Sequence, residues 1–266
     1  MERQLPTIEI EGTTFLVDVA KKELRELGKD VNTISIFEMD DKVTHYEFEY
    51  DKVSKNIPFP GYPDLIDIRI PQFVSLDPEG MAMVYNKTVA ELENKTDFDI
   101  MVNQEVLEAR LSGRLTTIEI EGHTFYVDLP MDCIRPKDDF STLGITFSEL
   151  EEHRSPFEEC YVFPYNPATF QIEQLDYDKI TSIPKDIVLI EIPLEHKLDP
   201  VGFARKYERE QREFVRQNNI QSHFIAKRVD WADTYIPKLI EENKERLSKK
   251  PEVKEETPKK RKGKKM

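Results

Sequence analysis

The sequence has few cysteines and no long apolar run. Its 266 residues include only two cysteines, Cys133 and Cys160, without paired spacing, which is typical of free thiols in a reducing compartment. No run of about 18 apolar residues occurs, so no membrane-spanning helix is expected. The first residues, MERQLPTIEIEG, lack the apolar core of a signal peptide. We therefore expect a cytoplasmic protein that does not associate with membranes.

Side chains arranged for catalysis are also scarce. No histidine stands at ligand spacing from another histidine or from a cysteine. The adjacent carboxylates of Glu158 and Glu159 disfavour a thiolate at Cys160. A dyad of Cys133 or Cys160 with His153 therefore has no support in the sequence. We expect no cofactor, and the sequence favours a protein that is not an enzyme. The five histidines are His45, His123, His153, His196 and His223.

The charge is divided unevenly along the chain. Charged residues make up 34% and hydrophobic residues 38%, with ordinary aromatic content, which is typical of small, highly charged globular domains. Residues 249–266 hold nine Lys/Arg and three Glu, a net charge of +6. The remaining 248 residues hold 29 basic and 49 acidic side chains, a net charge of −20. The chain therefore consists of an acidic body and a basic tail.

The basic tail is the strongest electrostatic feature. Its run PKKRKGKK (258–265) is of a kind that binds nucleic acid or anionic surfaces, or directs a protein to a nucleus. The alternative is a solvated tail, or one that folds back on the acidic body. The candidate nucleic-acid contacts are Lys259, Lys260, Arg261, Lys262, Lys264 and Lys265.

One stretch of the sequence occurs twice. Residues 5–19 read LPTIEIEGTTFLVDV and residues 115–129 read LTTIEIEGHTFYVDL, with eleven of fifteen positions identical. Further matched blocks follow in the same order, with small insertions between them. A match at a spacing of about a hundred residues predicts a duplicated domain rather than a short solenoid repeat. The later blocks are 34–39 with 145–150, 45–51 with 160–166, and 68–85 with 190–207.

Each copy predicts a hairpin, a variable segment, three strands and a helix. Apolar residues alternate with glutamates before Gly12 and Gly122, which supply the positive φ of a tight turn. In the variable segment, KKELREL (21–27) predicts a short helix that Gly28 ends. In the second copy, Pro136 argues against such a helix. The whole pattern predicts an α+β unit with an antiparallel sheet covered on one face.

Each copy ends with the pattern LDPxGxAxxY. The aspartate is a predicted helix N-cap and the proline occupies the first helical position. Gly80 and Gly202 fall in the first turn, where a missing side chain would allow close packing against the sheet. A capping carboxylate occupies the free N–H groups, so a phosphate site is not expected here. The predicted structural caps and turn residues are Asp77, Pro78, Asp199, Pro200, Gly12 and Gly122.

Several helices are expected outside the matched blocks. The connection 87–114 predicts a helix at about 105–111, and the second copy predicts one long helix over 200–216. HFIAKRV (223–229) reads as a short strand, and a last helix covers about 235–248. The sequence therefore predicts that the chain has four parts. They are a first α+β repeat with a helical connection (1–112), a second α+β repeat (113–216), a C-terminal helical extension (217–248) and a disordered Lys-rich tail (249–266).

Two features of the strands are candidate ligand sites. The duplicated carboxylates could give four oxygens to a hard cation if the two hairpins faced each other, or they could form a solvated sheet face that discourages aggregation. The aromatic stripes 46–50 and 161–165 could stack bases. Their acidic neighbourhood lacks Lys/Arg, so a place in the core is expected. The carboxylates are Glu9, Glu11, Glu119 and Glu121, and the stripes are Tyr46, Phe48, Tyr50, Tyr161, Phe163 and Tyr165.

These observations favour a non-enzymatic binding or adaptor protein that presents a composite surface from two duplicated domains to a protein partner. The positions that the copies share are apolar residues, turn glycines and caps, which describe a scaffold. One alternative is a nucleic-acid-associated accessory protein tethered by the basic tail, or an acidic mimic of DNA. Another alternative is a metal-assisted hydrolase that uses the duplicated carboxylates.

Overall fold

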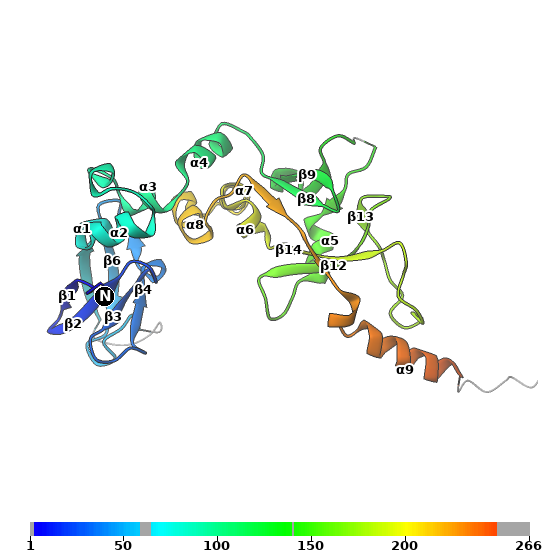
Figure 1. The fold of residues 1–266 in the computed structure, drawn as a ribbon, viewed down its shortest axis with the longest axis horizontal. Coiled ribbons are helices and arrows are strands. Elements are labelled where there is room, and N and C mark those ends of the chain that lie inside the picture. Colours follow the sequence, from blue (N-terminus) through cyan, green and yellow to red (C-terminus); the bar gives the residue numbers. More distant parts are fainter. Residues whose placement is uncertain (1–2, 59–64, 140, 249–266) are drawn as a thin grey trace, which may run out of the picture.

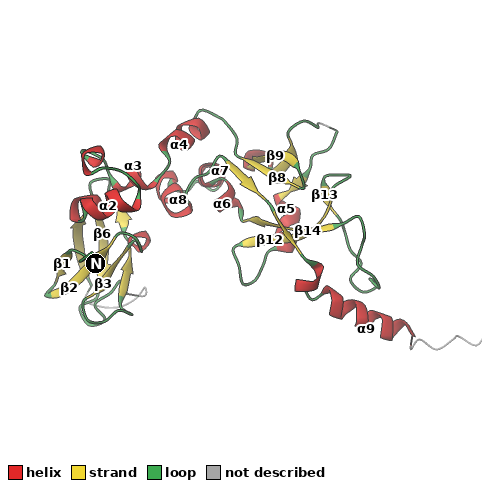
Figure 2. Ribbon diagram, viewed as in Figure 1, coloured by secondary structure: helices red, strands yellow, loops and turns green. Residues whose placement is uncertain are grey.

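The computed structural model describes residues 3–58, 65–139 and 141–248. It has two lobes of strands with short helices between them (Figure 1). Strands and helices are both abundant, so the predicted α+β class is confirmed (Figure 2). The basic tail and its six candidate nucleic-acid contacts lie outside the described residues. Among the described residues, no helix has the length and apolarity to cross a membrane.

The first lobe contains two antiparallel sheets and two short helices. The IEIEG hairpin opens the larger sheet, and the aromatic stripe 46–50 forms the centre of the smaller one. The larger sheet has the order β1 (Thr7–Ile10), β2 (Thr13–Asp18), β3 (Glu23–Glu26), β4 (Thr33–Ser35). The smaller sheet has the order β5 (Asp40–Asp41), β6 (His45–Tyr50), β7 (Ile66–Pro71). The helical segments are η1 (Ile36–Glu38), α1 (Phe73–Leu76) and α2 (Pro78–Val84).

The aromatic stripe of each lobe lies in a core. Tyr46, Phe48 and Tyr50 are buried on the inner face of β6, because side chains alternate along a strand. The ring of Phe15 from β2 meets Tyr50 edge to face, with centroids 6.5 Å apart. The second stripe, at 161–165, is buried in the same way. Neither stripe can therefore stack unpaired bases.

The second lobe has a similar series of elements, but the edge strand β13 of its smaller sheet follows the central strand, whereas β5 precedes the central strand in the first lobe. Its larger sheet contains β8 (Thr117–Ile120), β9 (His123–Asp128), β10 (Cys133–Pro136) and β11 (Ile145–Thr146). Its smaller sheet contains β12 (Cys160–Asn166), β13 (Gln171–Ile172) and β14 (Val188–Pro193). The helical segments are η3 (Leu129–Met131), α5 (Phe147–Leu150), η4 (Glu151–His153), α6 (Glu195–Leu198) and α7 (Pro200–Lys206).

Residues 217–248 are not purely helical. β15 (His223–Ile225) extends the larger sheet parallel to β8, and β16 (Lys227–Val229) extends the smaller sheet antiparallel to β14. HFIAKRV therefore forms two strands in two sheets, where the sequence predicted one. The chain then continues through η5 (Trp231–Asp233) into α9 (Ile236–Ser248).

A third, smaller core lies between the lobes. It is built by the connection and by the helices that follow β14, and it contains Phe98, Val102, Leu107, Val201, Val215 and Ile220. The connection forms η2 (Val89–Leu92), α3 (Asp97–Met101) and α4 (Gln104–Leu111), and α8 spans Gln211–Asn218. Burial of these apolar side chains packs the connection against α7 and α8 of the second lobe.

Two of the predicted helices are wrong. Residues 23–26 form strand β3, because Leu24 is buried opposite Val17 and this pairing overrides the helix propensity of KKELREL. The expected long helix over 200–216 is two helices, α7 and α8. Glu208 has a φ of +52° between them, and the Glu210 side chain accepts hydrogen bonds from the first turn of α8.

The two aspartates of the LDPxG segments cap α2 and α7. Asp77 accepts a hydrogen bond from the Gly80 N–H, and Asp199 accepts one from the Gly202 N–H, each at 2.9 Å. A Cβ atom on Gly202 would lie 2.2 Å from Asp199 Oδ2. The glycine therefore makes room for the capping carboxylate, rather than for the sheet as the sequence suggested.

Replacing Gly202 with alanine should remove this cap. We expect a loss of about 2 kcal/mol in the free energy of unfolding, because the carboxylate must leave the helix N-terminus and loses its hydrogen bond. Urea unfolding of Gly202→Ala measures the effect. Gly202 lies in α7, where alanine alone would favour the helix by about 1 kcal/mol. Unchanged or increased stability of Gly202→Ala would therefore contradict this account of the cap.

Candidate functional site

Helix α8 joins the second lobe to the first lobe through Arg216. Its fully buried guanidinium donates hydrogen bonds at 3.0 Å to the backbone carbonyls of Ile36 and Met39 in the first lobe. It also lies 5.4 Å from the ring centroid of Tyr46 and pairs with Glu213 at 2.8 Å. A buried guanidinium needs such partners, because an uncompensated charge in the interior is costly. Arg216 therefore fixes α8 against the first lobe.

Arg212, one turn earlier on α8, makes a second connection. Its Nε lies 3.0 Å from Asp41 Oδ2 of the first lobe, and its guanidinium lies 4.0 Å from the ring centroid of Phe98. Phe98 belongs to the connection between the lobes. α8 thus contacts the first lobe, the connection and its own lobe.

This arrangement creates a cleft at the junction of the lobes. The cleft has a volume of about 670 Å³, and four aromatic rings line it. Phe37 comes from η1 of the first lobe, Phe203 and Tyr207 from the α7 region, and Phe214 from α8. The ring centroids of Phe203 lie 4.5 Å from Tyr207 and 5.2 Å from Phe214. The polar lining residues are Glu159, His196, Lys197, Arg209, Gln217 and Asn218.

A smaller pocket of about 220 Å³ shares His196, Phe203 and Tyr207 with the cleft. Glu195, which is buried, lines this pocket and accepts a hydrogen bond from the Tyr207 hydroxyl at 3.3 Å. Its carboxylate also lies 3.6 Å from Lys206 Nζ. The aromatic cleft therefore continues into a small polar pocket.

The titratable groups of the pocket are shifted by burial. Burial raises the pKa of the Glu195 carboxyl above its ordinary value, against the opposing effect of Lys206. Burial lowers the pKa of the His196 imidazole, so this ring is neutral at pH 7. At the cleft rim, the hydrogen bond from Lys197 lowers the pKa of Glu159.

These opposite shifts predict opposite pH dependences of stability. The folded state holds the Glu195 proton to higher pH than the unfolded state, so the wild type loses unfolding free energy as pH rises above the ordinary pKa of 4.5. Glu195→Gln should therefore gain stability relative to the wild type as pH rises above 4.5. Urea unfolding across this range measures the difference.

Glu159→Gln is the matched control. The lowered pKa of Glu159 gives stability that is present above the ordinary pKa and lost as pH falls through the folded-state pKa. Glu159→Gln should therefore lose stability relative to the wild type as pH rises. Equal slopes for the two variants would contradict the assigned shifts.

The lining of the cleft is suited to binding. Aromatic and arginine side chains are enriched at the centres of protein interfaces, where they supply most of the affinity. Among the described lining residues of the cleft and its pocket, none is a serine, threonine or cysteine. A neutral histidine and a carboxyl of raised pKa therefore have no serine, threonine or cysteine beside them in this lining. The arrangement can hold an apolar or aromatic side chain and its polar neighbours.

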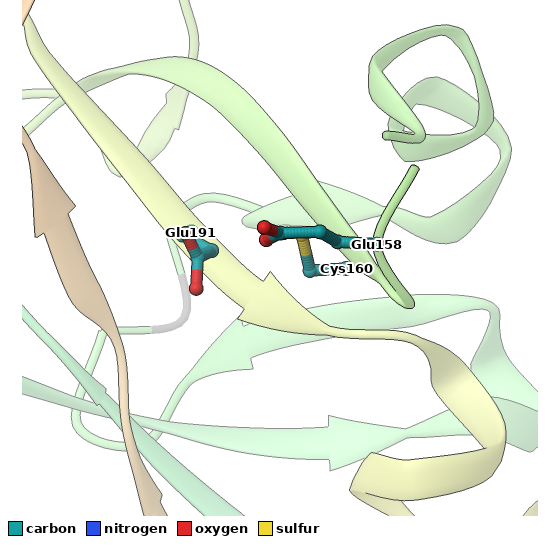
Figure 3. A group of neighbouring side chains, drawn as sticks. All are labelled: Glu158, Cys160 and Glu191. Carbon is teal, nitrogen blue, oxygen red and sulfur yellow. The ribbon is translucent and has the colours of Figure 1, made fainter. Parts of the chain in front are cut away.

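A second cluster lies on the outer face of β12 and β14. One ligand atom from each of Glu158, Cys160 and Glu191 lies within 4.8 Å of the others. Figure 3 shows the Glu158 carboxylate beside the Cys160 sulfur, with Glu191 on the neighbouring strand. Glu191 already pairs with Lys227 at 3.1 Å, and burial raises the pKa of the Cys160 thiol. A cation would have to displace both the lysine and the thiol proton.

The structure does not bring the duplicated carboxylates together. The two hairpins lie in separate lobes (Figure 1), and Glu9, Glu11, Glu119 and Glu121 do not form a group of metal-ligand geometry among the described residues. Glu11 follows the strand with a φ of +48° and pairs with Lys52 at 2.5 Å. Glu121 lies 3.4 Å from Arg228.

The cysteines and histidines are also dispersed. Both thiols are buried, and burial raises the pKa of Cys133 as well as that of Cys160. The His153 ring packs at 6.4 Å from Phe163, and burial lowers its pKa. Neither thiol is therefore a thiolate at neutral pH, and the structure places no dyad here in the described residues.

The sequence did not predict the cleft. Its aromatic lining comes from positions 37, 203, 207 and 214, which lie in two lobes and only meet after folding. One signal was available: the segment 203–216 carries aromatic residues among arginines in a chain that is otherwise acidic. Comparison with protein-family models, with curated proteins and with solved structures finds no match to this chain.

Proposed function

We propose that the chain is a non-enzymatic binding protein built from two copies of one α+β unit. The internal sequence match supports the duplication, and so does the order of elements, because each half has a hairpin-led sheet, a second sheet and a capped helix. Each capping aspartate also forms an ion pair with an arginine: Asp77 pairs with Arg3, and Asp199 pairs with Arg110. Two such units provide a surface that neither has alone.

The composite cleft is the observation that carries this proposal. Phe37 from the first lobe faces the same hollow as Phe203 and Phe214 from the second lobe. Arg216 holds α8 against the first lobe, and the third core packs α7 and α8 against the connection. We propose that a partner protein inserts an apolar or aromatic side chain into this cleft, with polar contacts to Lys197, Arg209 or Gln217 at the rim.

Site-specific photo-crosslinking tests the proposal. A photoreactive phenylalanine analogue at Tyr207 should give a discrete protein adduct in cells, and one at the remote, exposed Val53 should not. The adduct at 207 should be lost with Phe37→Asp, although position 37 lies in the other lobe, and should persist with the control Val31→Asp. Val53 and Val31 are 92% and 88% exposed. An adduct that is insensitive to Phe37→Asp would show that the cleft does not act as one site.

The basic tail supports a second, separate candidate function. Its net charge of +6 on 18 residues would give salt-dependent affinity for nucleic acid that does not depend on base sequence. Fluorescence anisotropy of labelled oligonucleotides, with the full chain and a version that ends at Ser248, tests it. Equal binding by the two proteins would remove the tail from consideration as a tether.

A further inference from the structure

The segment after α8 closes two sheet edges of the second lobe. β15 pairs with the outer edge of β8, and β16 pairs with the outer edge of β14. A single residue, Ala226, separates the two strands, and its N–H donates to the Glu119 carbonyl at 2.8 Å. One extended segment, 223–229, therefore completes both sheets.

The matching edges of the first lobe are open. β1 and β7 are end strands, and neither has a further strand beside it in the part of the chain that the structure describes. Ile118 and Ile190 in the second lobe are 0% and 1% exposed. Ile8 and Ile68, at the matching positions of the first lobe, are only partly buried. The first lobe thus has two unpaired edges whose apolar side chains are incompletely covered.

Two grooves lie near these strands, and the larger one is acidic. A groove of about 560 Å³ follows the start of β1 and is lined by Thr7, Leu76 and Pro78 among others. A second groove, of about 750 Å³, lies over β5, β6 and β7. Five carboxylates and one guanidinium line it, and a surface of this charge attracts basic segments. These residues are Glu38, Asp40, Glu47, Glu49, Asp67 and Arg69.

We infer that the first lobe binds an extended, basic segment of a partner protein, which adds a strand to β1 and to β7 as residues 223–229 do in the second lobe. Backbone hydrogen bonds along the open edges supply affinity, and alternate side chains supply selectivity. The inference rests on the proposed match between the halves, and it does not use the cleft.

Charge decides which segment fits. In the second lobe, Lys227 lies opposite Glu191 and pairs with it at 3.1 Å, and Val229 follows two residues later. In the first lobe, Arg69 stands at the position of Glu191, and Asp67 stands two residues before it. Because the strands are antiparallel, Asp67 would face the position of Val229. The preferred segment therefore has a cationic side chain at the position of Val229 and no cationic side chain at the position of Lys227.

Two labelled peptides test the inference by fluorescence anisotropy with the full chain. One has the sequence 220–231 of this chain, and the other has the same sequence with Lys227→Ser and Val229→Lys, which leaves the net charge of the peptide unchanged. The charge-shifted peptide should bind about tenfold more tightly, because it gains one ion pair and loses one repulsion. Asp67→Lys, at an exposed position, should abolish this preference, because the introduced lysine repels the lysine at the position of Val229 as Arg69 repels Lys227. Thermal unfolding establishes that the variant is folded.

Hydrogen exchange then locates the bound peptide. Slower exchange of the backbone amides of residues 7–10 and 66–71 in the presence of the peptide would support the inference. Protection of 117–120 and 188–193 would show exchange with the chain's own strands and would overturn it, as would failure of both peptides to bind. If the chain self-associates and Asp67→Lys abolishes this self-association, the open edges bind a second copy of the same chain. That result would overturn the inference of a different partner protein. Each outcome is independent of Phe37 and Tyr207, so the cleft is judged separately.

Discussion

Replacing Arg110 with alanine is expected to lower the free energy of unfolding by about 3–5 kcal/mol, the range for a buried charge that loses its partner. The Arg110 guanidinium donates three hydrogen bonds of 2.7–3.0 Å to the Asp199 carboxylate. The two side chains are 5% and 0% exposed. Without the arginine, the carboxylate stays buried with only the Gly202 N–H as a partner. Urea unfolding measures the loss.

The first lobe offers a matched control for this variant. Arg3 pairs with the cap Asp77 in the same way, but its side chain is 28% exposed. Arg3→Ala should therefore cost only about 1 kcal/mol, since water can replace part of the interaction. In the Arg110→Ala background, Asp199→Asn should restore part of the stability, because a neutral cap needs no guanidinium. Equal losses for Arg3→Ala and Arg110→Ala would contradict the assigned role of burial.

Replacing Arg216 with alanine should lower the free energy of unfolding by about 3–4 kcal/mol, because the carbonyls of Ile36 and Met39 lose their donor in a buried place. The loss should also uncouple the lobes, so that calorimetry shows two transitions where the wild type shows one. Arg212→Ala is the control, since that side chain is 27% exposed and should cost about 1 kcal/mol. A single transition for Arg216→Ala would contradict the assigned role of Arg216 in coupling the lobes.

Local patterns in the sequence were sufficient for the elements that depend on local chemistry. Alternating residues predicted β6 and β7, and periodic apolar residues predicted α4 and α9. The aspartate-proline pairs marked the starts of α2 and α7, because capping involves only residues of the first turn.

Interactions between distant residues could not be predicted in this way. β3 exists because of its neighbours β2 and β4, and not because of its own composition. The pairs Arg110–Asp199 and Arg216–Ile36 join residues 89 and 180 positions apart. The cleft depends on the second of these contacts, and one sequence carries no local signal for it.

Helix α8 holds the lobes as one body and thereby builds the composite cleft. Pulsed electron resonance between spin labels at positions 53 and 157, which are 92% and 93% exposed, tests it in a background where the two buried cysteines are replaced by alanine. The wild type should give one narrow distance distribution, and Arg216→Ala should give a broad one. A broad distance distribution in the wild type would contradict this account, because the two walls of the cleft would then have no fixed position relative to each other.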